Sequence, residues 1–135
     1  MGGAAIMCGH AGLRAGAGTV RLVTPAANRL AVHTSLPEAL FTDRDSGDLA
    51  EVASQAMALV AGPGIGTDAS AQRALGEMLA AVGAPRLLDA DALTLLSRDP
   101  SLFPERLRTR TLLTPHPGEV ARLLGIDIEQ VTDDP

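Results

Sequence analysis

The residues best suited to chemistry lie in three short segments, and residues 114–119 (TPHPGE) are the most informative of them. Two prolines flank His116 and restrict its backbone, and a histidine can donate or accept a hydrogen bond or titrate near neutral pH. Glu119 lies in the first turn of the helix expected to follow, where it could cap that helix or reach a metal ion through water. The rigid setting favours a functional His116 over a surface-loop histidine. A solvated helix start is the alternative for Glu119.

The second segment carries two carboxylates, Asp89 and Asp91, which follow a short strand expected at 86–88. Their spacing points both side chains to the same side if the strand persists. Such a pair can hold Mg²⁺, bind ribose hydroxyls or move a proton. Asp91 could instead cap the helix that follows, whereas Asp89 needs a partner because it ends a buried strand.

The third segment is residues 62–66 (GPGIG), which follow another strand and open a helix. Glycines let the backbone approach an anion or a flat ligand, and the free N–H groups of a helix start add partial positive charge. The dinucleotide fingerprint would need Gly or Ala at Thr67, and a P-loop would need a Gly-Lys-Ser/Thr ending. A tight packing turn and a ligand-binding loop are therefore both open. We find no zinc-ligand spacing, so no metal ligand is assigned.

Strands and helices alternate along the chain, and they must position these segments. Strands are expected at 19–24, 57–61, 86–88 and 111–113, with a short one within 36–45, and helices at 4–15, 25–32, 46–55, 68–82, 91–98 and 117–124. The acidic residues 127–135 predict a loop or a cut end of the domain. This alternation predicts one parallel sheet covered by helices. Right-handed crossovers would bring the three segments to one edge, where such sheets bind ligands.

Composition limits the class of protein. The 135 residues suit one domain, 1–135, and its core must use small aliphatic side chains because the chain has two Phe and no Trp or Tyr. A net charge of −5 and dispersed basic residues argue against nucleic-acid binding. The single cysteine, Cys8, excludes an internal disulfide, and no apolar run is long enough to span a membrane. With no basic region at its start, we expect a cytoplasmic protein.

Taken in order, the segments resemble the NAD(P)HX dehydratases. The resemblance is carried by GAA at 3–5, LRAGAG at 13–18, PE at 37–38, GPGIG at 62–66, LDADAL at 88–93 and LTPHPGE at 113–119. It spans nearly the whole chain and implies a ribokinase-like α/β fold, a three-layer parallel sheet with helices on both faces. Thr94 is a departure, because the family usually has Asn after DADAL.

The resemblance also implies a reaction. Family members use ADP or ATP, with Mg²⁺, to phosphorylate the hydroxyl of the S epimer of hydrated NADH or NADPH (NADHX or NADPHX), and then expel phosphate. It implies that Ala4, Gly64 and His116 contact the hydrated dinucleotide, and that Asp89, Asp91 and Glu119 support the pocket or Mg²⁺. The family's Lys-Gly segment at the phosphates and its catalytic Asp are expected beyond Pro135. A strand is expected before Gly3, so we expect an incomplete domain.

Three interpretations stay open. The chain is part of a dehydratase, a kinase of the same fold acting on another alcohol (hydroxymethylpyrimidine or hydroxyethylthiazole type), or a non-catalytic dinucleotide-binding domain. The TPHPGE segment favours the dehydratase over the kinase. The absence of the Lys-Gly segment and the catalytic Asp favours a non-catalytic binding domain for this chain alone. A missing strand would expose apolar faces, so we also expect self-association into a homo-oligomer. The choice between ADP and ATP, and the presence of an NAD(P)HX epimerase domain or partner, stay open.

Overall fold

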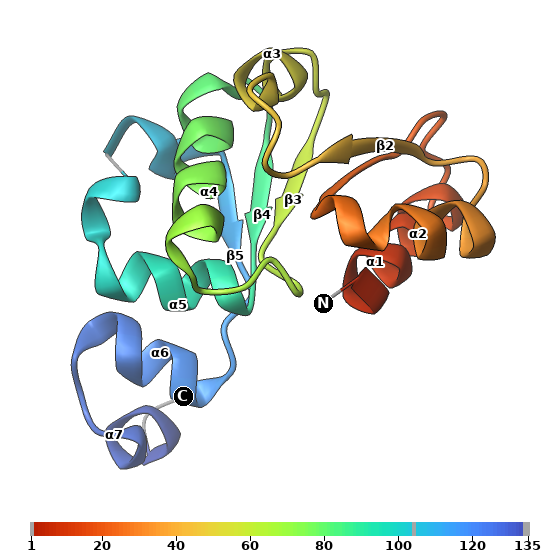
Figure 1. Cartoon of the computed structure of the whole chain (residues 1–135). Helices are drawn as coiled ribbons and strands as arrows, with labels where there is room; N and C mark the ends of the chain where they lie inside the picture. Colours follow the sequence, from red (N-terminus) through yellow and green to blue (C-terminus); the bar gives the residue numbers. More distant parts are fainter. Residues whose placement is uncertain (1, 104, 134–135) are drawn as a thin grey trace.

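Strands and helices alternate in the computed structural model, which describes residues 2–103 and 105–133 (Figure 1). The elements are α1 (Gly2–Arg14), β1 (Arg21–Thr24), η1 (Ala26–Asn28), α2 (Arg29–Ser35), β2 (Leu40–Asp43), α3 (Leu49–Ser54), β3 (Leu59–Ala61), α4 (Ala69–Ala81), β4 (Arg86–Leu88), α5 (Asp91–Arg98), η2 (Pro100–Leu102), η3 (Glu105–Arg110), β5 (Thr111–Leu113), α6 (Pro117–Leu124) and α7 (Ile128–Asp133). No helix of this described part is long and apolar enough to cross a membrane.

The strands pair in parallel, as expected, but they form two sheets rather than one. β1 pairs with β2, and β3, β4 and β5 form a second sheet in that order. Side chains join the two sheets, because Val23 of β1 and Leu59 of β3 pack against the same cluster of buried residues. The expectation of a single continuous sheet was therefore wrong, since a repeated strand–helix order cannot show where the ladder between neighbouring strands is interrupted.

Helices α4 and α5 cover one face of the three-stranded sheet (Figure 1). The core between them is aliphatic, with Leu75 and Leu79 of α4 packed against Leu88 of β4. The opposite face carries Val60 and Leu112, which are 56% and 60% exposed. The described fold is thus mixed α/β, with parallel sheets flanked by helices, and it leaves an apolar patch on that face.

Local signals explain where α4 begins and ends. The carboxylate of Asp68 accepts a hydrogen bond from the amide of Ala71 at 2.8 Å, so Asp68 is the helix N-cap. Buried residues then recur at the three- and four-residue spacing of one helix face: Ala71, Ala74, Leu75, Met78 and Leu79. The helix ends before Val82, where the backbone becomes extended.

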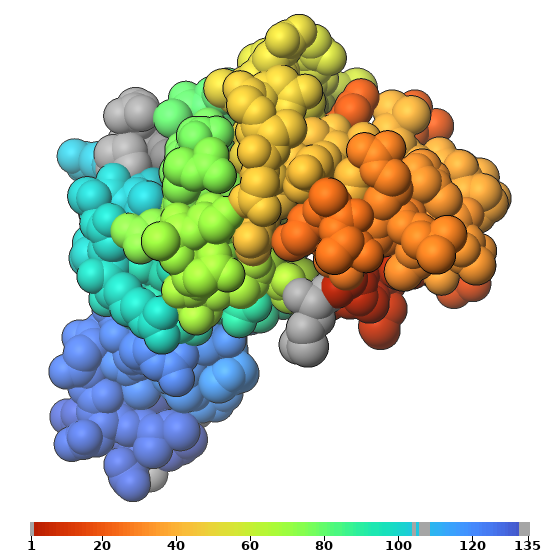
Figure 2. All heavy atoms as spheres, in the orientation of Figure 1, coloured from red at the N-terminus to blue at the C-terminus, as the bar shows by residue number. Residues whose placement is uncertain are grey.

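The loop expected over 127–135 was also a wrong prediction within the described residues. Residues Ile128–Asp133 form α7, and the Gln130 side chain accepts a hydrogen bond from the amide of Asp127 at 3.0 Å. This is half of a capping box, and its signal is an Asp followed three residues later by a Gln. Helices α6 and α7 protrude at one end of the molecule (Figure 2). Residues 134–135 of the expected loop lie outside the described residues.

Candidate functional site

The three segments expected at one edge lie side by side at the carboxyl ends of β3, β4 and β5. The amide of Asp89 donates to the carbonyl of Ala61 at 3.1 Å, and the amide of Thr114 donates to the carbonyl of Leu88 at 3.2 Å. These bonds continue the parallel ladders by one residue beyond each strand. The starts of the glycine loop, the Asp89 segment and the histidine segment are therefore adjacent.

The glycine loop, residues 62–66, packs directly on the backbone of Asp89. Gly62 has a φ of +128°, and a Cβ placed there would lie 1.7 Å from the Asp89 carbonyl oxygen. No residue with a side chain fits such a contact without moving the backbone. Glycine at position 62 is therefore needed for packing, whatever the loop binds.

The condition under which the two carboxylates would point to the same side, a strand that continues past Leu88, is not met. The strand ends at Leu88 and the chain turns at Ala90, whose φ is +48°. Asp89 Oδ1 accepts a hydrogen bond from the amide of Ala90 at 2.9 Å, whereas Asp91 Oδ2 accepts one from the amide of Gly66 at 2.9 Å. The alternative that Asp91 caps its helix was wrong too, because Ala90 is the N-cap and Asp91 the first residue of α5.

Helix α1 carries the single thiol of the chain, that of Cys8. Burial raises the pKa of the Cys8 thiol, and the negative charge of Asp89 raises it further. Ala4, one helical turn before Cys8, is half-buried. Gly2 packs closely on η1, since a Cβ there would lie 2.7 Å from Asn28 Oδ1.

His116 and Glu119 form a capping box at the start of α6. His116 Nδ1 accepts a hydrogen bond from the amide of Gly118 at 3.1 Å, and Glu119 Oε2 accepts one from the amide of His116 at 3.0 Å. Glu119 Oε1 lies 3.4 Å from His116 Nε2. Glu119 is buried, so the solvated alternative for it was wrong, whereas the imidazole is 67% exposed. The ring is thus held in one orientation and presented to solvent.

Sequence reasoning missed Arg44, which follows β2 and reaches the glycine loop. Its Nη1 donates to the carbonyl of Ile65 at 2.8 Å. Local sequence patterns carry no signal for this contact, because 21 positions separate the two residues. Thr94, the departure from the family pattern, accepts a hydrogen bond from Arg122 of α6 at 3.4 Å.

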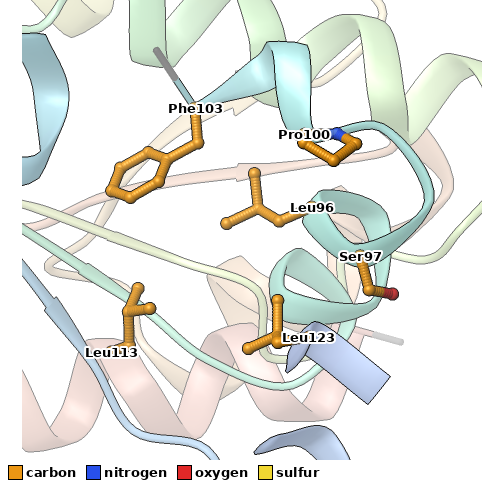
Figure 3. Close-up of a pocket in the computed structure, with 6 residues that line it drawn as sticks. All are labelled: Leu96, Ser97, Pro100, Phe103, Leu113 and Leu123. Carbon is orange, nitrogen blue, oxygen red and sulfur yellow. The ribbon is translucent and has the colours of Figure 1, made fainter. Parts of the chain in front are cut away.

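A small hollow of about 150 Å³ lies between α5, β5 and α6 (Figure 3). It is lined by Leu96, Ser97, Pro100, Phe103, Leu113 and Leu123. The hydroxyl of Ser97 donates to the carbonyl of Thr94, so the lining offers little to a charged ligand. The hollow contains no candidate site residue. In the described part of the chain, no group of three or more His, Cys, Asp or Glu could hold a metal ion.

Comparison with known proteins gives concordant matches. The sequence model of the family described as NAD(P)H-hydrate dehydratase matches residues 1–134. The bifunctional NAD(P)H-hydrate repair enzyme Nnr of Vibrio cholerae is 40% identical, over 99% of this chain and 26% of that protein. The ADP-dependent (S)-NAD(P)H-hydrate dehydratase of Lactiplantibacillus plantarum is 38% identical, over 97% of this chain and 47% of that protein. The chain thus spans between a quarter and half of these relatives.

Solved structures of related proteins superpose on this chain over nearly its whole length. A ribokinase-like superfamily protein from Enterococcus faecalis superposes with a TM-score of 0.87 at 34% identity, covering 95% of this chain and 45% of that one. The ADP/ATP-dependent NAD(P)H-hydrate dehydratase from Bacillus subtilis, co-crystallised with ATP/Mg²⁺, superposes with a TM-score of 0.74 at 29% identity, covering 99% and 48%. The ribokinase-like fold expected from the sequence is confirmed.

Proposed function

This chain belongs to the NAD(P)H-hydrate dehydratase family, and on that premise we propose that its sheet edge binds the S epimer of hydrated NADH or NADPH. The observation that carries the proposal is the adjacency of residues 62–66, Asp89 and Thr114 at the carboxyl ends of neighbouring parallel strands. Ligands of open α/β sheets bind at this edge. In the whole protein the bound hydrate would lose water and return to the dihydropyridine.

We assign binding and orientation to the residues of this chain. The backbone around Gly64 and the half-buried Ala4 would approach the dinucleotide closely, because neither has a bulky side chain. His116 would orient it through its exposed ring, since Gly118 and Glu119 already occupy its two nitrogens. Orientation of a reactant contributes to catalysis without any proton transfer.

We propose that ADP or ATP donates a phosphoryl group in the whole protein, making the substrate hydroxyl a good leaving group. In the described part of the chain, Asp89, Asp91 and Glu119 do not form a group of three or more ligands that could hold a metal ion, so we do not assign magnesium to them. The substrate side of the reaction, rather than phosphoryl transfer, is therefore the part we assign to these residues.

The names of the relatives suggest a context. Because several are bifunctional repair enzymes, we propose that an NAD(P)HX epimerase activity, fused or separate, supplies the S epimer. We further propose a cytoplasmic setting, where NADH and NADPH are used. Self-association stays a prediction, motivated by the exposed Val60 and Leu112.

The test is to mix the purified 135-residue chain with S-NADPHX, Mg²⁺ and either ADP or ATP, while recording binding by calorimetry and dihydronicotinamide absorbance. We expect binding without nucleotide-dependent recovery of absorbance, and recovery with one of the longer relatives as positive control. Absence of S-NADPHX binding at millimolar concentration would contradict the proposed site. Recovery by the chain alone would contradict our assignment of phosphoryl transfer to other segments. Hydroxymethylpyrimidine and hydroxyethylthiazole, offered in parallel, should be neither bound nor phosphorylated.

A further inference from the structure

Arg44 is a buried cation that the proposed binding chemistry does not use directly. It is 8% exposed, and its amide donates to the carbonyl of Thr24 at 3.1 Å, which extends the pairing of β1 and β2 by one residue. Its backbone therefore belongs to the two-stranded sheet. Its guanidinium reaches the glycine loop that follows the three-stranded sheet.

The strongest contact of the guanidinium is with the backbone of that loop. Nη1 lies 2.8 Å from the Ile65 carbonyl oxygen, whereas Nε lies 3.6 Å from Asp45 Oδ1 and Nη2 lies 3.8 Å from Asp68 Oδ1. Both carboxylates are exposed to solvent, which weakens their attraction to the guanidinium. The Nε atom is buried without a hydrogen-bond partner. The side chain is therefore placed by the loop carbonyl more than by its ion pairs.

Asp91 holds the other end of the same peptide group. The Ile65 carbonyl and the Gly66 amide belong to one planar unit. Its oxygen accepts from Arg44, and its N–H donates to Asp91 Oδ2 at 2.9 Å. A cation at the oxygen and an anion at the N–H both favour one direction of this peptide. Gly66, with a φ of +89°, would otherwise let it rotate easily.

We propose that Arg44 is a positioning residue: together with Asp91 it clamps the Ile65–Gly66 peptide, and this sets the direction of the backbone groups that residues 62–66 present to the dinucleotide. The ligand-related half of this inference rests on the proposed function. Arg44 itself touches no substrate in this arrangement. It couples the end of β2 to the binding loop.

Arg44→Met removes the donor at similar side-chain length, and Arg73→Met is the matched control. Arg73 loses the same charge and pairs with the same Asp45, at 3.5 Å, but its contacts lie on the exposed side of α4. We expect Arg44→Met to speed exchange of the Gly66 amide and to weaken S-NADPHX binding, each by about tenfold or more. Arg73→Met should change neither. Arg44→Lys should recover part of both effects, because an ammonium can still donate to the carbonyl.

Amide exchange is followed by ¹⁵N NMR of the 135-residue chain, binding by calorimetry, and global stability by thermal unfolding. Unchanged Gly66 exchange in Arg44→Met would overturn the clamp. Equal behaviour of the Lys and Met variants would also overturn it, because a general packing role predicts no rescue. If the Met variant does not fold, Arg44→Gln replaces it and must show faster Gly66 exchange than wild type.

The two proposals fail separately. If the wild-type chain binds no S-NADPHX, the proposed function is wrong, while Gly66 exchange still decides whether Arg44 orders the loop. If wild type binds and Arg44→Met loosens Gly66 without weakening binding, the loop is ordered by Arg44 but its order does not serve the ligand, and the inference is overturned. The double variant Arg44→Met with Asp91→Asn should change Gly66 exchange and S-NADPHX binding by less than the product of the two single fold-changes. The effects overlap because both residues hold one peptide.

Discussion

Replacing Gly62 with alanine tests the contact between the glycine loop and Asp89. The new Cβ would start 1.7 Å from the Asp89 carbonyl oxygen, and real Cβ atoms essentially never come closer than 3.0 Å to a neighbour. The obstacle is backbone rather than a flexible side chain, so a whole segment must move. Alanine must also adopt a φ of +128°, a strained conformation that costs about 1–3 kcal/mol.

Overpacking in a closely packed region adds about 1–3 kcal/mol. We therefore expect Gly62→Ala to lower the free energy of unfolding by about 2–6 kcal/mol, a large share of the roughly 5–15 kcal/mol typical of a domain. Gly83→Ala is the control, because a Cβ at Gly83 meets nothing within 4 Å. It should stay within about 0.5 kcal/mol of wild type.

Urea unfolding followed by far-ultraviolet circular dichroism measures the difference, since the chain has no Trp or Tyr for fluorescence. The urea midpoint should fall sharply for Gly62→Ala and stay constant for Gly83→Ala. A Gly62→Ala variant within about 1 kcal/mol of wild type would refute the reasoning, because neither the strain nor the overlap could then be as described. If Gly62→Ala is already unfolded without urea, the loss of unfolding free energy is at least as large as the wild-type free energy of unfolding.

Two further predictions concern the other segments of the edge. His116→Ala should lose about 1 kcal/mol of stability, because it loses the capping bond to Gly118. His116→Asn should keep the cap and the stability but bind S-NADPHX more weakly in calorimetry. Binding of wild-type strength by the Asn variant would show that His116 only caps the helix. Cys8, whose thiol pKa is raised by burial and by Asp89, should react with iodoacetamide at pH 8 more slowly than glutathione, because less of it is thiolate. Asp89→Asn removes a negative charge, which should lower the pKa of Cys8 and speed the reaction, and Asp91→Asn is the control. No acceleration in Asp89→Asn would contradict the electrostatic influence of Asp89 on the thiol.

Local patterns predicted much of this fold and less of the site. Helix α4 could be predicted with its cap, because Asp68 and Ala71 are close in sequence. The adjacency of the three segments followed from topology alone. The separation of Asp89 from Asp91 did not, since it depends on the positive φ of Ala90, a residue type that rarely adopts it.

Arg44 could not have been found from spacing, because its role depends on how two sheets come together. The break between those sheets is equally non-local: residues 19–24 have the pattern of a strand whether or not β3 hydrogen-bonds to them. The capping signal of Asp127 and Gln130 was present and was missed. Its acidic setting favoured a loop, although Ile128 and Val131 supply apolar positions for a helix.

The division into two sheets has a consequence for hydrogen exchange across the molecule. In the described part of the chain, β1 and β2 share no ladder with β3, β4 and β5. The two groups of strands can therefore act as separate cooperative units with different opening free energies. Ala4 and Cys8 belong to the first unit, while Gly64 and His116 follow strands of the second. A ligand that spans both units would bind only their joined state, so it should slow exchange in the less stable unit most and bring the two opening energies together.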